Sequence, residues 1–138
     1  MSKKVFLAPS VFIAQNERSN PKHSQAADYF RYFVQEKFYL YTSYLSIAEA
    51  YRTIYSQISA SLAREFLRAI VLGSINIIYP SEGDLKATVK AIVTSQSSEL
   101  KFSDAQMAVL AYRNSISQIA TFEYLHPLFG LNTFSLPV

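Results

Sequence analysis

The sequence predicts an α/β fold of three layers, with a central, mainly parallel sheet of four to five strands and helices on both faces. Short apolar runs typical of buried strands alternate with longer segments whose apolar residues recur at helical spacing. Strands separated by helices indicate βαβ units, which form parallel sheets covered on both sides. No linker, repeat or low-complexity stretch interrupts this pattern, so residues 1–138 are predicted to be a single domain.

Two strands are predicted in the first half of the chain, at residues 5–7 and 38–41, because both are short runs of apolar or aromatic residues. One helix is expected between these strands. Two helices are expected after them, the first capped by Thr42-Ser43 and the second ending at Gly73. The residues expected on the inward faces are Ala26, Phe30, Phe33 and Val34, then Ala48, Tyr51, Tyr55 and Ile58, then Leu62, Phe66 and Ile70.

The second half is predicted to add strands at residues 75–79, 119–120 and 131–134, the last of them short. Two helices lie between these strands. Ser81 with Asp84 resembles a capping box, and Ser103 with Gln106 matches the S-x-x-Q form of that motif. The apolar residues expected on the two helices are Leu85, Val89 and Ile92, then Met107, Leu110 and Ala111.

The composition is that of a globular domain. Half of the 138 residues are hydrophobic and 17% are charged, which argues against disorder. The absence of cysteine excludes disulfides, thiolate catalysis and cysteine-based zinc sites, and it fits a reducing cytoplasm. A net charge of +3 permits nucleic-acid binding without indicating it.

The first apolar run follows two lysines, as in a signal peptide. Pro9 and the polar residues 15–18 cut that run short. No segment approaches the roughly 20 apolar residues that a membrane-spanning helix needs. We therefore expect a soluble, cytoplasmic domain that does not contact a membrane.

Three carboxylates from distant parts of the chain lie near the predicted strand ends. Glu49 is on the helix after the second strand, Asp104 is in the first turn of its helix, and Glu123 follows the fourth strand. The carboxyl ends of parallel strands share one edge, where such sheets bind ligands, so these side chains are expected to converge. Taken singly, each acid also has an ordinary explanation, as a solvated helical Glu, a helix-dipole partner or a loop residue.

Four segments in order resemble the motifs of PIN domains and cover nearly the whole chain. Residues 5–13 are similar to the opening strand and helix start, and residues 42–51 to the segment with a helical glutamate. Residues 100–108 resemble the Asp-Ala pair that opens a helix, and residues 119–131 the closing T-F-D … F-G segment. The length also matches the VapC-like toxin branch of the family. The resemblance implies a PIN-like fold and a ribonuclease that hydrolyses RNA phosphodiesters with Mg²⁺ or Mn²⁺.

By this resemblance, Glu49, Asp104 and Glu123 are the catalytic metal ligands, with Ser10 and Thr121 as supporting hydroxyls. Hard divalent cations prefer such oxygen donors, and the bound ion polarises the phosphate and activates water. Glu123 replaces the usual aspartate, but its longer arm still reaches an ion. Ala8 is the graver departure, because it stands where the family has its first metal-binding aspartate and a methyl group ligates nothing.

Ala8 leaves two explanations open. It is either native to a degenerate protein that binds without cutting, or an engineered Asp→Ala change that silences a toxic nuclease; the otherwise intact motifs favour the second. The primary hypothesis is a toxin-type PIN endoribonuclease, impaired by Ala8, with an antitoxin as its protein partner. The alternatives are a non-catalytic PIN-like module that binds RNA or a protein, and a flavodoxin-like domain of unrelated function.

Three further groups of residues carry weaker signals. His23 and His126 are interpreted as exposed loop residues, because neither lies in a motif at a strand end. Tyr44, Tyr51 and Tyr55 share a helix and suggest a homodimer surface. Basic residues flanking the motifs are candidates for phosphate contacts, with ordinary surface charge as the simpler interpretation. These basic residues are Arg18, Lys22, Lys101 and Arg113.

Overall fold

A computed structural model describes residues 3–137, which form a five-stranded, all-parallel sheet and six helices. The strands are β1 (Lys4–Leu7), β2 (Tyr39–Ser43), β3 (Asn76–Ile78), β4 (Gln118–Ala120) and β5 (Asn132–Thr133). The helices are α1 (Pro9–Asn16), α2 (His23–Gln35), α3 (Tyr44–Gln57), α4 (Ala60–Leu72), α5 (Glu82–Thr94) and α6 (Phe102–Arg113). The predicted α/β class is confirmed. None of the described helices is long and apolar enough to cross a bilayer.

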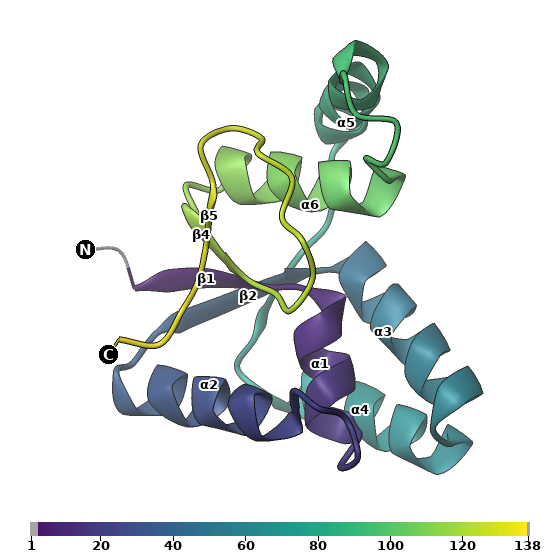
Figure 1. Ribbon diagram of the computed structural model, residues 1–138, viewed down its shortest axis with the longest axis vertical. Coiled ribbons are helices and arrows are strands. Elements are labelled where there is room, and N and C mark those ends of the chain that lie inside the picture. Colours follow the sequence, from purple (N-terminus) through teal and green to yellow (C-terminus); the bar gives the residue numbers. More distant parts are fainter. Residues whose placement is uncertain (1–2, 138) are drawn as a thin grey trace.

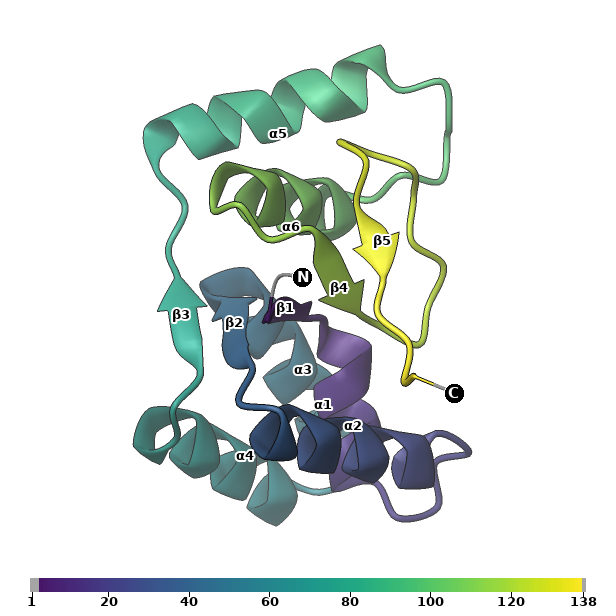
Figure 2. The ribbon, with the colours of Figure 1, turned by 90° about the vertical axis from the view of Figure 1, so that its left-hand side faces the viewer.

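The strands lie in the order β3-β2-β1-β4-β5, and every neighbouring pair is parallel (Figure 2). The sheet therefore grows in one direction from β1 to β3 and in the other from β4 to β5, with the reversal between β1 and β4. A flavodoxin-like sheet has the order 2-1-3-4-5, so that alternative is wrong. In open parallel sheets, ligands bind beyond the carboxyl ends of the strands at such a reversal.

The alternation of side chains along β1 divides the core into two parts. Val5 and Leu7 are fully buried on the face covered by α1, α2, α3 and α4. Phe6 points to the other face, where it packs with Ile119 of β4 and Leu110 of α6. Figures 1 and 2 show the resulting layers, with α5 lying outside α6. Successive strand residues point to opposite faces, so a run of three apolar residues is what a strand covered on both sides requires.

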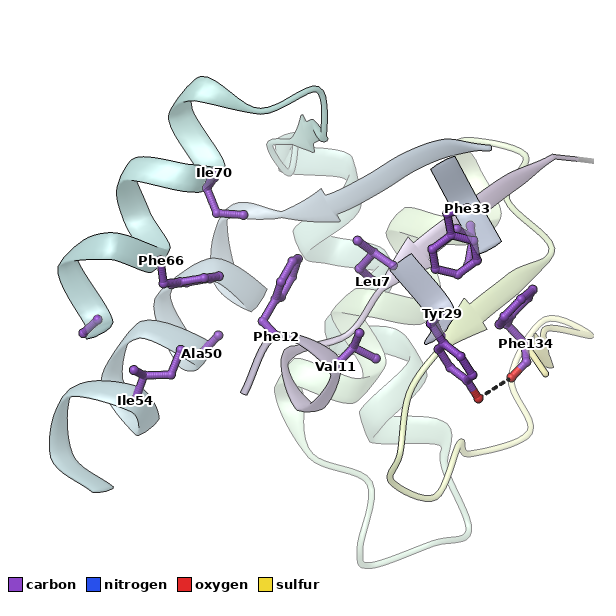
Figure 3. Packing of buried hydrophobic residues seen from close by; sticks show 13 residues of the cluster. Leu7, Val11, Phe12, Tyr29, Phe33, Ala50, Ile54, Phe66, Ile70 and Phe134 are labelled. Atoms are coloured by element: carbon purple, nitrogen blue, oxygen red, sulfur yellow. Dashed lines mark hydrogen bonds between the residues drawn. The ribbon is translucent and has the colours of Figure 1, made fainter. Parts of the chain in front are cut away.

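An aromatic cluster joins α2 to the last strand (Figure 3). Phe33 is 1% exposed, and its ring centroid lies 5.2 Å from that of Phe38 and 4.8 Å from that of Phe134. The Tyr29 hydroxyl donates to the Phe134 carbonyl at 3.4 Å. These contacts fix the segment after β5 against α2, which is about a hundred residues away in the sequence.

The helix ends agree with the capping predictions except at α6. The Ser43 hydroxyl accepts from the Ser46 amide, Ser81 and Asp84 form a capping box, and α4 ends at Gly73. The Ser103–Gln106 capping box is wrong. Helix α6 begins two residues earlier, with Lys101 at the N-cap, and among the described residues no side chain caps it.

Most residues predicted to face inward on α2 and α4 do so, but one residue at the margin of each apolar face is exposed. Ala26, Phe33, Phe66 and Ile70 are buried. Val34 is 77% exposed, however, and Leu62 is 38% exposed. Each of these two residues lies next to the buried stripe, where neighbouring elements do not reach. Single exposed apolar residues of this kind are ordinary in folded proteins.

The faces of α3 and α5 differ more from the prediction. Helix α3 buries the smaller side chains of Ser46 and Ala50 together with Ile54, and leaves Ala48 and Tyr55 exposed. Small residues allow α3 to lie close to α1 and α4, and this close packing outweighs the burial of tyrosine.

Helix α5 packs on α6 through polar residues. Its buried residues are Asp84 and Thr88, whereas Leu85 and Val89 are about half exposed, at 46% and 47%. An Asp84 oxygen lies 2.8 Å from Nε of Arg113 on α6, and this ion pair, whose carboxylate is largely buried, sets the rotation of α5. The prediction followed apolar spacing alone and therefore chose the wrong face.

Replacing Phe33 with alanine is expected to lower the free energy of unfolding by about 3–5 kcal/mol, because it empties the centre of the aromatic cluster. Urea denaturation followed by circular dichroism measures this change. The neighbouring Val34→Ala variant is the matched control, expected to change the free energy of unfolding by no more than about 0.5 kcal/mol. Equal effects at the two positions would contradict the packing described here.

Candidate functional site

A pocket of about 230 Å³ opens at the carboxyl edge of the sheet, beside the reversal between β1 and β4. Figure 1 shows the starts of α1 and α3, the start of α6 and the loop after β4 gathering at this edge. All six residues predicted for the site line this one pocket. They are Ala8, Ser10, Glu49, Asp104, Thr121 and Glu123. The three distant carboxylates thus line the same pocket, while their roles remain predictions.

Two hydroxyl groups hold the loop that carries Glu123. Ser10 Oγ and Thr121 Oγ1 are 3.2 Å apart, which links the start of α1 to the end of β4. The Phe122 amide donates to Ser10 Oγ at 3.0 Å, and the Glu123 amide donates to Thr121 Oγ1 at 3.1 Å. Each hydroxyl is therefore already engaged with the protein, and together they fix where the chain leaves β4.

Ala8 closes the floor of the pocket where β1 ends. It is 2% exposed and belongs to the apolar cluster that contains Phe6, Met107 and Leu110. It is also the N-cap of α1, directly before Pro9 in the first turn. Its methyl group contributes packing and provides no atom that binds a cation.

Glu49 is the carboxylate most affected by its surroundings. Partial burial raises its pKa, and the negative charges of Asp104 and Glu123 raise it further. A hydrogen bond from the Ser103 side chain and the positive charge of Arg52 act in the opposite direction. The predicted capping box is absent because Ser103 lies inside α6 and not at its N-cap, and its side chain is hydrogen-bonded to Glu49. Asp104 and Glu123 are therefore both close enough to repel the charge of Glu49.

Comparison with solved structures finds close likeness of fold at low sequence identity. VapC20 of Mycobacterium tuberculosis, a sarcin-ricin loop cleaving toxin, superposes with a TM-score of 0.76 over 86% of this chain and 89% of its own, at 15% identity. FitAcB from Neisseria gonorrhoeae gives 0.65 over 95% of this chain and 96% of its own, at 14% identity. This chain has a VapC-like PIN fold. No family model and no curated protein matches it by sequence.

The acids of this PIN fold suit a divalent cation in chemistry but not in arrangement. Carboxylate oxygens are the donors that Mg²⁺ and Mn²⁺ prefer. Within residues 3–137, however, no three Asp, Glu or His side chains lie close enough together to hold one ion. Glu49, Asp104 and Glu123 as they stand do not form a complete metal site, and Ala8 adds no donor.

His126 lies beside the site, so its interpretation as an exposed loop residue is wrong. Its side chain is 14% exposed, and its Nε2 is 3.8 Å from an oxygen of Asp104. The loop after β4 folds back over the start of α6, and this return brings His126 to the pocket. It follows Glu123 by three positions along the chain, and this nearness was the available signal. His23 is also not exposed, because its Nδ1 lies 2.9 Å from the Ala14 carbonyl oxygen and its ring is half-buried.

The basic residues singled out in the sequence have different places. Lys101 lines the pocket, whereas Arg113 forms the structural ion pair with Asp84. Two residues that sequence reasoning missed also line the pocket, Arg52 on α3 and Tyr124 after Glu123. Arg52 follows Glu49 by three positions and so shares its helix face, a relation that was visible in the sequence.

Glu49→Gln is expected to make the protein more stable than the parent chain at pH 7 in metal-free buffer. The folded state holds the Glu49 proton more tightly than the unfolded state, so the parent loses stability as the pH rises through the raised pKa of Glu49. The difference should therefore disappear below pH 4, where the carboxyl group is protonated in both states (about 4.3 for an ordinary Glu). Thermal unfolding across a pH series measures it.

The exposed Glu99, which does not line the pocket, provides the control for that experiment. Glu99→Gln should leave the pH dependence of the unfolding temperature unchanged. A Glu49→Gln variant less stable than the parent at pH 7 would contradict the raised pKa of Glu49.

Proposed function

We propose that this chain is a toxin-type PIN ribonuclease that acts on RNA phosphodiesters in the pocket at the carboxyl edge of the sheet, with its activity impaired by Ala8. One observation carries the proposal. Glu49, Asp104 and Glu123 come from distant segments and line one pocket at the reversal of a VapC-like PIN sheet. The fold neighbour VapC20 is a sarcin-ricin loop cleaving toxin, which supports RNA as the substrate class.

Mg²⁺ or Mn²⁺ is the cofactor that this function would use, because the donors in the pocket are carboxylates. Among the described residues the three acids do not form a group that could hold an ion, and the place at the end of β1 holds a methyl group. A fourth carboxylate at position 8 would add an oxygen donor to the lining of the same pocket. The chain is therefore expected to bind RNA and to cleave it poorly.

Ala8→Asp is expected to raise the RNA-cleavage rate by at least about a hundredfold in the presence of Mg²⁺ or Mn²⁺, since metal chemistry supplies several kcal/mol. Cleavage of a labelled RNA, with EDTA as the metal-free arm, measures the rate. Adding Asp104→Asn to Ala8→Asp should abolish the gain. Ala48→Asp, which places the same charge at an exposed position on α3, is the matched control and should gain nothing.

The alternative is a non-catalytic PIN-like module that binds RNA or a protein partner. Within residues 3–137 no three acids or histidines form a group that could hold a metal ion, and this favours the module. The same variant separates the two functions. An Ala8→Asp protein that folds, stays inert with both metals and still binds RNA or a partner would establish the module and sink the nuclease.

A cognate antitoxin is the proposed protein partner, and the cytoplasm the proposed location, because a ribonuclease of this type has to be restrained in the cell that makes it. The three carboxylates give the pocket an acidic wall formed by Glu49, Asp104 and Glu123. A basic side chain from the antitoxin would offset the repulsion between these acids.

A homodimer is the proposed assembly, and exposed tyrosines are its proposed surface. Tyr44 and Tyr55 on α3 are 62% and 53% exposed. The rings of Tyr44 and Tyr79 lie 6.1 Å apart, and those of Tyr51 and Tyr55 lie 5.9 Å apart. Aromatic side chains exposed in this way are enriched at protein–protein interfaces.

Charged substitutions in this surface are expected to convert the dimer to a monomer. Tyr44→Glu combined with Tyr55→Glu should halve the mass measured by light scattering after gel filtration, because a buried carboxylate opposes association. Tyr39→Glu is the control, since Tyr39 is equally exposed, at 65%, but lies at the start of β2. A monomeric parent chain would refute the dimer directly.

A further inference from the structure

An exposed tyrosine stands at the mouth of the acidic pocket. Tyr124 lines the pocket together with its neighbour Glu123, yet it is 73% exposed. The rings of the aromatic cluster around Phe33 are packed in the core, whereas this ring presents its surface to solvent next to the residues proposed for chemistry. Burial does not explain the position of Tyr124, and a ligand that covers the ring would.

The ring of Tyr124 is held in place from the side. It makes a T-shaped contact with His126, with the ring centroids 5.0 Å apart and the planes at 80°. His126 in turn lies 3.8 Å from Asp104 at the start of α6. On the other side of Tyr124, the Glu123 amide is hydrogen-bonded to Thr121. The loop is therefore fixed before and after Tyr124, and its ring is arranged in advance of any binding.

Two basic side chains line the same pocket. Arg52 lies on α3, one helical turn after Glu49, and Lys101 is the N-cap of α6. Both are exposed, and within the described part of the chain neither forms a salt bridge that would occupy it. A phosphodiester chain carries one negative charge per nucleotide, so two cations in the same pocket as an exposed aromatic ring match the alternation of base and phosphate in a single strand.

We propose that Tyr124 is the platform on which a base of single-stranded RNA stacks, and that Arg52 and Lys101 bind the adjoining phosphates. This inference rests on the proposed function and specifies how the substrate is held. Stacking on an aromatic ring accepts any base, while the carboxylates of the pocket face the scissile bond. Tyr124, Arg52 and Lys101 are thus positioning residues: they orient the strand over Glu49, Asp104 and Glu123.

Tryptophan fluorescence tests the platform directly. The chain contains no tryptophan, so Tyr124→Trp introduces a single fluorophore at the proposed stacking position. Titration with an unlabelled single-stranded oligoribonucleotide should quench this fluorescence, and saturate at the concentration where the anisotropy of a labelled copy saturates. Tyr112→Trp is the control, because Tyr112 is 58% exposed and stacked on Phe129, but does not line the pocket. Its fluorescence should not change.

Binding affinities test the same platform without a fluorophore. Tyr124→Ala is expected to weaken RNA binding about tenfold, whereas Tyr124→Phe should keep the affinity of the parent, because stacking uses the ring and not the hydroxyl. The parent chain, which has Ala8, suits these measurements because it is not expected to cleave the bound RNA. Circular dichroism confirms that each variant is folded.

The salt dependence of binding tests the two cations. Arg52→Ala and Lys101→Ala should each weaken binding and lower the slope of log affinity against log salt by about 0.7, as expected when one phosphate contact of a single strand is lost. Arg64→Ala is the matched control, because Arg64 is exposed on α4 and does not line the pocket. It should leave the slope unchanged.

The failure of this inference differs from the failure of the proposed function. RNA that binds equally well to Tyr124→Ala and the parent, and that leaves the fluorescence of the Tyr124→Trp variant unquenched, would overturn the platform while RNA binding stands. RNA that neither binds to the parent nor is cleaved by the Ala8→Asp variant would overturn the proposed function and the platform together.

Discussion

The parallel pairing of β1 with β4 is the constraint on which the rest of the structure depends. The order of the strands reverses there. The segments that follow β1 and β4 therefore leave the sheet in different directions, and the space between them stays open at the carboxyl edge. The hydrogen bonds of Ser10 and Thr121 then join the two exits. Helix α1 leaves from one exit and the loop with Glu123 from the other. A pocket beside this seam follows from topology, whichever side chains line it.

The side chains that line the pocket carry opposing charges. Burial and the repulsion of its two acidic neighbours raise the pKa of Glu49, while Arg52 and a hydrogen bond from Ser103 offset part of that cost. The basic residues Arg52 and Lys101 are therefore part of the same balance as the acids. A pocket lined by both signs of charge agrees with the proposed RNA ligand, whose phosphates would meet Arg52 and Lys101 beside the acids.

The fold was largely predictable from the sequence because its signals are local. Strand segments such as residues 5–7 are apolar on both faces, and Ser43 and Ser81 cap their helices by contacts within one turn. The errors concern contacts between distant residues. The ion pair between Asp84 and Arg113 sets the rotation of α5. The Ser103 side chain is hydrogen-bonded to Glu49 and does not cap α6. His126 reaches Asp104 because the loop after β4 folds back, and its nearness to Glu123 in the sequence was the one sign that it lies by the site.

Ala8 shows how stability and function diverge at one position. The residue is buried among Phe6, Met107 and Leu110, so its methyl group adds to the apolar packing of the β1–β4 face. An aspartate there would face the repulsion that already raises the pKa of Glu49, and would be tolerated only with a cation to offset it. An alanine avoids this repulsion. It does not alter the strand order, the hydrogen bonds of Ser10 and Thr121, or the position of Tyr124. Under the proposed function, the chain would therefore keep its RNA-binding surface while lacking the ligand needed to cut RNA.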